Sequence, residues 1–304
     1  MSFIESNRPE SPVESGAGVE VALQPARSTV ISGEGLHTLS PSRASDFKQC
    51  PQLFKFRSID RLAEPTSVYQ ARGTTAHLAL ERLFDLPARD RTPQRLYDLF
   101  RQAWTALRTT DEYVDLFESL DDERAWGVES LSVLANYYSL ENPADIDPFE
   151  RELDMLEEMD DMTIRGILDR IDERPDGQLV ITDYKTGKAP PQRYALSAFF
   201  ALKIYALLVR NRVGRTPVEL RLLYLGNATM YTIPIDDTAL NGMQRQLRAL
   251  WAAINRAIER SHFPTRTSVL CNWCSFQDVC PAFEGTALTE VPIKARPEPA
   301  SVAD

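Results

Sequence analysis

The chain has 304 residues, 43% of them hydrophobic, and a formal net charge of −10 at pH 7. This length allows one large domain with an elaborate core or two small domains. The negative charge argues against a nonspecific electrostatic grip on nucleic acid, because neutralising phosphates requires clustered Lys and Arg. The sequence has no secretory signal at its N-terminus, no apolar run long enough to span a bilayer and no internal repeat. We therefore expect a cytoplasmic protein without membrane contact.

The two ends of the chain differ in composition from its middle. Residues 1–38 are rich in Ser, Pro, Gly, Glu and Val without a helical period, and residues 285–304 are rich in Pro, Ala and Glu. Both segments are predicted to be disordered tails. Residues 39–284 are predicted to form one domain.

The middle of the chain alternates between helical and strand patterns. Helices are predicted over residues 70–86, 92–108, 120–140, 192–212 and 238–262. A strand-rich stretch begins near residue 150, and two further strands are predicted over residues 218–224 and 230–235. Helices before and after a short mixed sheet predict an α/β fold.

Basic and aromatic residues are concentrated at the start of this domain. Phe47, Phe54 and Phe56 lie among the basic residues Arg43, Lys48, Lys55, Arg57 and Arg61. Such a mixture can contact a nucleic-acid backbone and stack on its bases, which makes Arg43, Lys48 and Arg57 candidate DNA contacts. A helix with a solvated basic face explains the same pattern equally well.

One histidine stands in the first predicted helix. His77 shares a helical face with Leu80 and Phe84, and Thr74 or Thr75 is expected to cap the start of the helix. A lone histidine on an apolar face is more often a core residue than a ligand. The helical position alone therefore assigns no function to His77.

Residues 166–188 predict a β-hairpin. The turn sequence Pro-Asp-Gly at 175–177 suits a tight turn, because Pro presets φ, Asp bonds its own backbone and Gly accepts positive φ. If the turn is centred near residue 176, Asp169 and Asp183 face each other with Cβ atoms about 4.5–5.5 Å apart. Two carboxylates this close repel unless a cation lies between them, and oxygen ligands suit Mg²⁺ or Mn²⁺.

A lysine follows the second of these aspartates on the same predicted strand. Lys185 is two positions after Asp183, so both side chains project from one face of the strand. The ammonium group could orient a water or stabilise negative charge that develops on a phosphate. The alternative is a surface hairpin whose Asp and Lys residues form a cross-strand ion pair, and periodicity alone does not separate the two.

The four cysteines of the chain form a second candidate ligand set. Cys50 stands apart, whereas Cys271, Cys274 and Cys280 have the spacing Cys-x2-Cys-x5-Cys. Disulfides are rare in the reducing cytosol, so metal ligation is the leading use. Four thiolates can hold zinc or an iron-sulfur cluster, and spacing separates these poorly. A proline follows both Cys50 and Cys280, as after the last cysteine of bacterial ferredoxin runs, which favours iron.

The hairpin resembles a known nuclease family. Asp169 followed by Asp183-x-Lys185 resembles the PD-(D/E)-x-K phosphodiesterase superfamily, and the strings Gly-Ile-Leu-Asp-Arg-Ile-Asp and Asp-Tyr-Lys-Thr-Gly-Lys resemble its RecB-like exonuclease branch. The resemblance implies that Asp169 and Asp183 hold the metal and that Lys185 is catalytic. Gly73-x-x-x-His77 also matches the branch, which implies that His77 is a metal ligand. The implied fold is restriction-endonuclease-like, with a mixed central sheet flanked by helices and a helical N-terminal part.

The cysteines resemble those of one group within this branch. RecB-like nucleases of the AddB type, and certain CRISPR-associated nucleases, carry one cysteine before the nuclease core and three after it, holding a 4Fe-4S cluster. Residues 39–51, which end beside Cys50, resemble the entry motif of that group. The resemblance implies that Cys50, Cys271, Cys274 and Cys280 bind a 4Fe-4S cluster that joins the two ends of the domain. Zinc is the alternative.

One family motif is incomplete in this chain. RecB-like nucleases usually carry Gln-x-x-x-Tyr on the helix after the lysine strand, where this chain has Ala201 and Tyr205. The Gln helps to position the metal site or the DNA, so its absence leaves the rate and substrate handling unassigned. Tyr205 is an accessory candidate that could equally be a core residue. Glu152 resembles the Glu on the strand that leads into the site and is the second accessory candidate.

These patterns predict a metal-dependent DNA exonuclease that hydrolyses phosphodiester bonds of single-stranded or frayed ends in repair or recombination, with Mg²⁺ or Mn²⁺ held by His77, Asp169 and Asp183. The chain has no Walker Gly-x4-Gly-Lys-Ser/Thr string, so any helicase motor would be a separate polypeptide. The main alternative is a noncatalytic DNA-end binding or scaffold protein that retains the fold and the cluster. A redox-sensitive regulator is a third hypothesis. The intact Asp-x-Lys favours catalysis over both.

Overall fold

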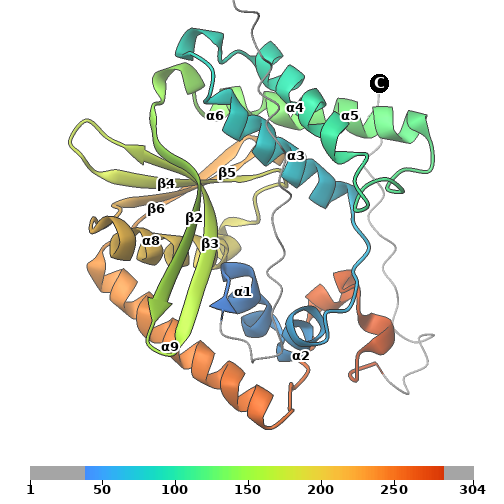
Figure 1. The fold of residues 1–304 in the computed structure, drawn as a ribbon, viewed down its shortest axis with the longest axis vertical. Helices are drawn as coiled ribbons and strands as arrows, with labels where there is room; N and C mark the ends of the chain where they lie inside the picture. The colour runs from blue at the N-terminus through green and yellow to red at the C-terminus, as the bar shows by residue number, and fades with distance from the viewer. Residues whose placement is uncertain (1–37, 284–304) are drawn as a thin grey trace, which may run out of the picture. The chain divides into compact units, whose positions relative to one another are not determined.

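A computed structural model describes residues 38–283, in which six strands form one mixed sheet (Figure 1). The strands are β1 (Thr38–Leu39), β2 (Pro148–Met159), β3 (Met162–Glu173), β4 (Leu179–Lys185), β5 (Glu219–Tyr224) and β6 (Thr229–Pro234). Their order is β1-β3-β4-β5-β6, and β2 also pairs with β3. The β1–β3 and β4–β5 pairs are parallel and the others are antiparallel. Apart from Thr38, the tails expected over residues 1–38 and 285–304 lie outside the described residues.

The β3–β4 hairpin has the register expected from its turn. Arg170 pairs with Thr182 and Glu173 with Leu179, so the hairpin is centred at residue 176. Gly177 has φ +81°, in the left-handed region that glycine adopts without strain. The Asp176 carboxylate accepts a hydrogen bond from the backbone N–H of Gln178, as an Asp in a turn commonly does.

Four helices cover one side of the sheet, as Figure 1 shows. They are α3 (Val68–Leu83), α4 (Pro93–Leu107), α5 (Leu120–Ala135) and α6 (Tyr137–Leu140), with short turns η2 (Ala88–Asp90) and η3 (Pro143–Asp145) between elements. Their shared core packs Trp104, Trp126 and Tyr137 with Tyr184 and Leu223 of the sheet. Aromatic side chains bury 150–250 Å² each, so this cluster fixes α3 firmly against the end of β4.

The helices on the other side are α1 (Pro41–Gln49), α7 (Gln192–Ala198), α8 (Phe200–Val213) and α9 (Asp237–Glu259) (Figure 1). α8 contacts β2, β3, β4 and β5, and α1 packs on both α8 and α9. The remaining short elements are α2 (Pro51–Phe54), η1 (Lys55–Ile59), η4 (Leu225–Asn227), η5 (Val269–Trp273) and η6 (Gln277–Val279). Among residues 38–283, no helix combines the length and the apolar composition needed to cross a bilayer.

The predicted helices and strands are confirmed, with three differences. The helix expected over 120–140 ends at Ala135 and resumes as α6, and the helix expected over 192–212 is interrupted at Phe199. The predicted cap at Thr74 or Thr75 is wrong. Ser67 caps α3, because its hydroxyl accepts from the backbone N–H of Gln70 while the Gln70 side chain accepts from the Ser67 N–H.

Candidate metal centre

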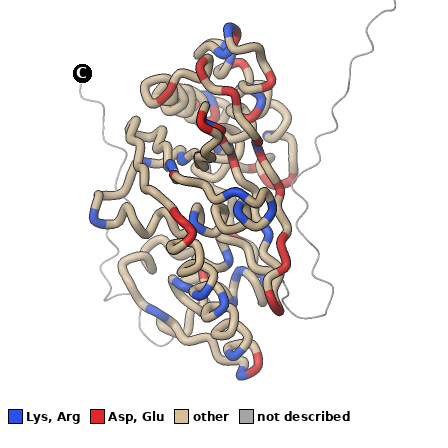
Figure 2. The backbone as a smooth tube through the Cα atoms, turned by 90° about the vertical axis from the view of Figure 1, so that its left-hand side faces the viewer, with Lys and Arg blue, Asp and Glu red and all other residues tan. Residues whose placement is uncertain are grey.

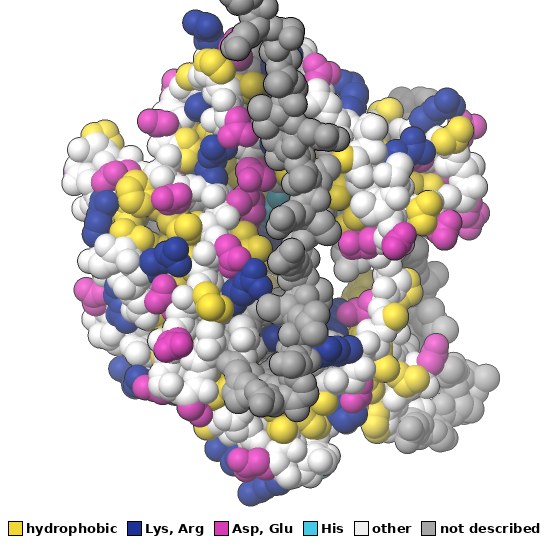
Figure 3. All heavy atoms as spheres, in the orientation of Figure 1, with side chains coloured by type: hydrophobic (Ala, Val, Ile, Leu, Met, Phe, Trp, Pro, Cys, Tyr) yellow, Lys and Arg dark blue, Asp and Glu magenta, His cyan; other side chains and the backbone are white. Residues whose placement is uncertain are grey.

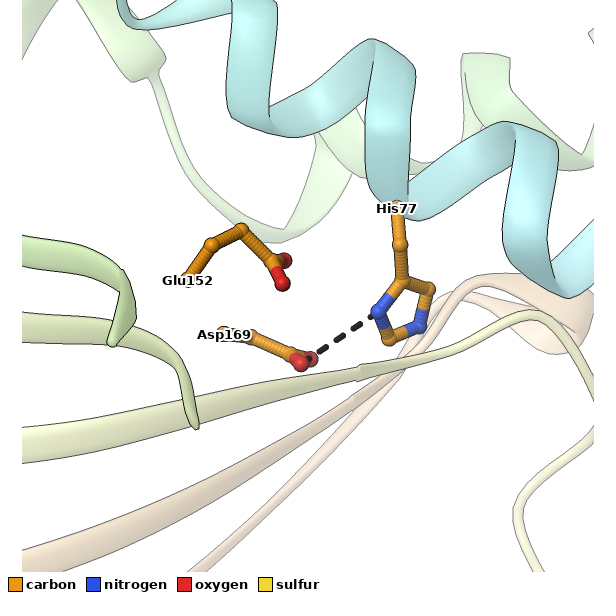
Figure 4. A group of neighbouring side chains, drawn as sticks. All are labelled: His77, Glu152 and Asp169. Atoms are coloured by element: carbon orange, nitrogen blue, oxygen red, sulfur yellow. Dashed lines mark ion pairs between the residues drawn. The ribbon is translucent and has the colours of Figure 1, made fainter. Parts of the chain in front are cut away.

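His77 is in the third turn of α3, and its side chain contacts the open end of the β3–β4 hairpin, away from the turn. Its Nε2 lies 3.0 Å from the carbonyl oxygen of Tyr184. Its Nδ1 lies 3.3 Å from Oδ1 of Asp169, as the dashed line in Figure 4 marks. A carbonyl oxygen only accepts hydrogen bonds, so Nε2 carries the hydrogen and donates it. In the neutral imidazole the lone pair of Nδ1 therefore points at the Asp169 carboxylate.

Three acidic residues lie side by side on β2, β3 and β4. Arg151 pairs with Arg170 and Leu153 with Leu168, so Glu152 lies opposite Asp169 across the β2–β3 ladder. On the other side of β3, the described pairing with β4 ends at Arg170–Thr182, and Asp169 and Asp183 are the next residue on each strand. Asp169 therefore has an acidic residue near it on each adjacent strand.

A local backbone distortion directs Glu152 toward this site. Glu152 has φ +44°, a left-handed conformation that is rare for a residue with a side chain, and it lies in the middle of β2. Such strained positions in a strand re-aim a side chain and are frequent at functional sites. The ligand atoms of His77, Glu152 and Asp169 all lie within 4.8 Å of one another (Figure 4). The sequence pattern ranked Glu152 only as an accessory residue.

Asp183 lies next to this group but is engaged by Lys185. The Lys185 ammonium lies 2.5 Å from Oδ2 of Asp183, and Asp183 is almost fully buried. The Lys185 side chain is 43% exposed, so part of it can be reached from solvent. Asp183 and Lys185 therefore form an ion pair beside the three converging ligand atoms.

The crowding of charges shifts the pKa values of the site. Burial and the nearby Asp169 carboxylate raise the pKa of Glu152 to about 7 and that of Asp183 to about 6. Burial acts to lower the pKa of His77, but the Asp169 carboxylate outweighs it and raises that pKa to about 9. Burial acts to raise the pKa of Asp169, but His77 outweighs it and lowers that pKa. Without a cation, the group relieves its repulsion by holding protons.

The donor set of this group fits a hard divalent cation. Carboxylate oxygens with one imidazole nitrogen suit Mg²⁺ or Mn²⁺. The Nδ1 lone pair of His77 faces the Asp169 and Glu152 carboxylates, which is repulsive unless a cation or a proton lies between them. A metal-binding histidine usually donates its other N–H to a carboxylate or a backbone carbonyl, as His77 does to Tyr184. In the space-filling view, a histidine is visible beside acidic side chains near the middle of the face (Figure 3).

Comparison with known proteins identifies a family that covers most of the chain. Residues 38–281 match the family described as the PD-(D/E)XK nuclease superfamily. The chain belongs to the PD-(D/E)XK nuclease superfamily. Its mixed sheet flanked by helices is consistent with the restriction-endonuclease-like fold that the sequence resemblance implied.

Two solved structures are similar to this superfamily member. The first is named "Putative exonuclease", from Eubacterium rectale, with a TM-score of 0.50 and 14% identity, covering 84% of this chain and 90% of that one. The second is SSO0001, with a TM-score of 0.39 and 14% identity, covering 82% of this chain and 88% of that one. Comparison with curated proteins finds no match. At these identities the first likeness shows a shared fold.

Tyr205 of α8 is a further residue beside the candidate metal centre. Burial, followed by the carboxylates of Asp183, Asp169 and Glu152, raises the pKa of Tyr205. Its ring lies against Gly166 of β3, where a side chain would collide with it. Ala201, one turn earlier on α8, has no polar group to offer at the position where the family usually has Gln.

The three candidate DNA contacts differ in how they are engaged. Arg57 is held by the carboxylates of Asp46 and Glu64, and Arg43 donates to the Thr38 carbonyl. The Lys48 ammonium lies 4.1 Å from the centre of the Phe200 ring, without a carboxylate partner among the described residues. Figure 2 shows acidic and basic positions next to each other along much of the fold. Among the residues that the structure describes, Lys48 and Arg43 thus have no carboxylate partner, whereas Arg57 has two.

The structure brings the four cysteines together. Cys50, between α1 and α2, lines one pocket with Cys271, Cys274 and Cys280. All four are partly buried and free of disulfides. Beside them, Leu53, Phe56 and Phe276 form a small apolar cluster. We call residues 50–59 and 266–283 the cysteine module.

Proposed function

We propose that this protein is a metal-dependent deoxyribonuclease that hydrolyses phosphodiester bonds at single-stranded or frayed DNA ends, in DNA repair or recombination. The observation that carries the proposal is the convergence of His77, Glu152 and Asp169 within 4.8 Å in a chain of the PD-(D/E)XK nuclease superfamily. A scaffold protein has no need of a strained Glu152 or of opposed carboxylates, so catalysis is favoured over the noncatalytic alternative.

In this proposal His77 Nδ1, Asp169 and Glu152 hold Mg²⁺ or Mn²⁺, and Asp183 adjoins as a further ligand. The bound ion would supply a polarised water and neutralise charge on the scissile phosphate. Asp169 keeps its charge because its pKa is lowered, so it is the anchor of the set. Tyr184 holds the tautomer of His77 by accepting the Nε2 hydrogen.

Lys185 is the proposed catalytic cation. Burial acts to lower the pKa of Lys185, but Asp183 outweighs it and raises that pKa, so the ammonium stays charged. A fixed positive charge beside the metal ligands can stabilise negative charge on the pentavalent phosphate or orient the attacking water. The exposed part of its side chain is the route by which a phosphate would meet it.

The cysteine module is proposed to hold a 4Fe-4S cluster. The four cysteines line one pocket, and four thiolates can hold zinc or an iron-sulfur cluster. The proline that follows both Cys50 and Cys280 supports a cluster, in which each thiolate binds a different iron. We propose that the module joins the two ends of the nuclease domain, residues 39–284.

The test of the nuclease is cleavage of end-labelled single- and double-stranded oligonucleotides by anaerobically purified protein with Mn²⁺ or Mg²⁺. We expect metal-dependent cleavage that falls by at least about 10²-fold in Asp183→Ala and Lys185→Ala. Asp154→Ala is the matched control, because this half-exposed β2 carboxylate is paired with Arg165. The cleavage ladder would give the polarity, and iron content with the absorption spectrum would identify the cluster.

Binding of DNA without cleavage in any metal would overturn the nuclease and support the DNA-end scaffold. Equal activity of the wild-type protein and both site variants would trace the cleavage to a contaminant. A helicase, if one acts with this protein, is proposed to be a separate polypeptide.

A further inference from the structure

The main chain of Tyr184 forms hydrogen bonds with two of the proposed metal ligands. Its backbone N–H donates to Oδ2 of Asp169 at 2.7 Å, and its carbonyl oxygen accepts from Nε2 of His77 at 3.0 Å. The same residue therefore orients the carboxylate on β3 and the imidazole on α3. Any shift of the Tyr184 main chain would move both ligands relative to each other.

The side chain of Tyr184 is anchored on the helical side of the sheet. The residue is 4% exposed, and its hydroxyl lies 2.5 Å from Nη1 of Arg170. Its ring packs edge-on against the rings of His77 and Tyr137, with centroids 6.1 and 5.9 Å away. Among these contacts, the bond to Arg170 is the one that restrains the ring from sliding within its pocket.

Arg170 is a buried cation with a complete set of partners. It is 1% exposed, pairs with Glu141 at 2.5 Å and with Asp172 at 2.9 Å, and also reaches Thr182. Glu141 directly follows α6, 29 residues before Arg170. The guanidinium therefore connects the helical layer to two strands of the sheet beside the site.

We propose that Arg170 is a positioning residue for the metal centre, acting through the Tyr184 hydroxyl to hold His77 and Asp169 in their ligating geometry. Arg170 itself does not reach the ligand atoms. The inference rests on the proposed function only in assigning the metal to His77 and Asp169. Partners of metal ligands commonly change metal affinity 10–100-fold when they are removed.

A merely structural role is the competing explanation. A buried ion pair costs desolvation, so Arg170 could serve only to neutralise Glu141 and Asp172. Deleting the guanidinium would leave two buried carboxylates unpaired and would endanger folding. The decisive variant therefore leaves Arg170 in place and removes the hydroxyl through which it acts.

The test compares Tyr184→Phe with Tyr137→Phe. Tyr137 is also fully buried, and its hydroxyl lies 3.5 Å from Nη1 of the same Arg170, but no hydrogen bond joins it to His77 or Asp169 in the described structure. Mn²⁺ affinity is measured calorimetrically on the intact protein, together with the Mn²⁺ concentration that gives half-maximal cleavage. We expect Tyr184→Phe to weaken Mn²⁺ binding about tenfold, with cleavage recovered at saturating Mn²⁺, and Tyr137→Phe to change it less than twofold.

Arg170→Lys adds a second measurement that retains the buried charge. A lysine cannot bind Glu141 through two nitrogens and also reach the Tyr184 hydroxyl, so we expect weaker Mn²⁺ binding in the same direction as Tyr184→Phe. Unchanged affinity in Tyr184→Phe, or equal losses in the two Tyr→Phe variants, would overturn the positioning role. A wild-type protein that binds Mn²⁺ without cleaving DNA would overturn the nuclease and leave the comparison of affinities valid. A wild-type protein that binds no Mn²⁺ would overturn both.

Discussion

The two ligand sets of this molecule are supported in different ways. The carboxylate–histidine site is built on α3, β2, β3 and β4, and the surrounding core includes fully buried residues such as Tyr137 and Leu223. The cysteine module consists of short turns around three apolar side chains, and Trp273 and Val269 on it are 67% and 74% exposed. The first site is held by packing, whereas little packing holds the second.

This difference indicates which set depends on its metal. A site fixed by a packed core keeps its geometry without the ion, and the ion then mainly relieves charge repulsion. A site on weakly packed turns gains its order from the metal, so that binding energy becomes folding energy. Losing the divalent ion should therefore affect activity, and losing the proposed cluster should affect stability.

The largest expected effect follows from breaking the link at Cys50. Joining Cys50 to Cys271 closes a loop of more than two hundred residues, which by the chain-entropy estimate constrains the unfolded chain by about 5 kcal/mol. That is comparable to the net stability of a whole domain. We expect Cys50→Ala to be colourless, poorly soluble and lower in melting temperature, as measured by absorbance, iron analysis and calorimetry.

The control is removal of the divalent ion from the wild-type protein. Chelation with EDTA is expected to abolish cleavage and to shift the melting temperature far less than Cys50→Ala does. A Cys50→Ala protein with full iron content and the wild-type melting temperature would refute the dependence of the module on its cluster.

The pH dependence of Mn²⁺ affinity tests the packed site. Metals bind the deprotonated ligands, and burial with the Asp169 carboxylate raises the pKa of Glu152 to about 7 and that of Asp183 to about 6. Both groups are largely protonated at low pH, so affinity must increase as pH rises. Between about pH 5.5 and 7.5 we expect these two carboxyl groups alone to contribute a gain of roughly a hundredfold, measured by calorimetry.

Loss of the proton from His77, whose pKa is raised to about 9 by Asp169 against the effect of burial, should add about tenfold per pH unit to this rise and extend it above pH 7.5. Glu152→Gln is the matched variant, because it keeps the shape of the side chain and removes its titration. Its affinity should vary less with pH than that of the wild-type protein. An affinity that is flat with pH in the wild-type protein would show that these groups do not ligate the ion.

The sequence was sufficient for the hairpin but not for all of the site. The symmetric turn around Asp176 set the register of the hairpin, because a tight turn leaves little freedom in pairing, and Asp169 and Asp183 are the next residues beyond Arg170–Thr182. Glu152 was harder to rank, since its approach depends on a left-handed residue in the middle of a strand, which no local pattern specifies. An acidic residue on the strand adjoining Asp169 was the available signal.

Contacts between residues far apart in the sequence could not be predicted from local patterns. Arg170 meets Glu141 across 29 residues, and Tyr184 meets His77 across 107, so neither contact follows from local periodicity. The helices lie where their 3.6-residue pattern predicted them. α3, however, is capped by Ser67 and not by Thr74, because the Ser67–Gln70 capping box satisfies two backbone N–H groups at once. Patterns fix local elements, and the packing of the core decides which side chains meet.

The smallest expected effect is the difference in stability between alanine substitutions at a tightly packed glycine and at a loosely packed one. A Cβ on Gly166 would overlap Cε1 of the Tyr205 ring and lie 3.0 Å from its Cδ1, so Gly166→Ala must displace a ring that lies beside the carboxylates. We expect a loss of about 1–3 kcal/mol in the free energy of unfolding, measured by urea titration, together with weaker Mn²⁺ binding. Gly127, inside α5, has nothing within 4 Å of such a Cβ, and Gly127→Ala is expected to stabilise by up to about 1 kcal/mol. If both substitutions stabilised the protein equally, the ring of Tyr205 would be free to move, and the site would be less rigidly packed than its burial indicates.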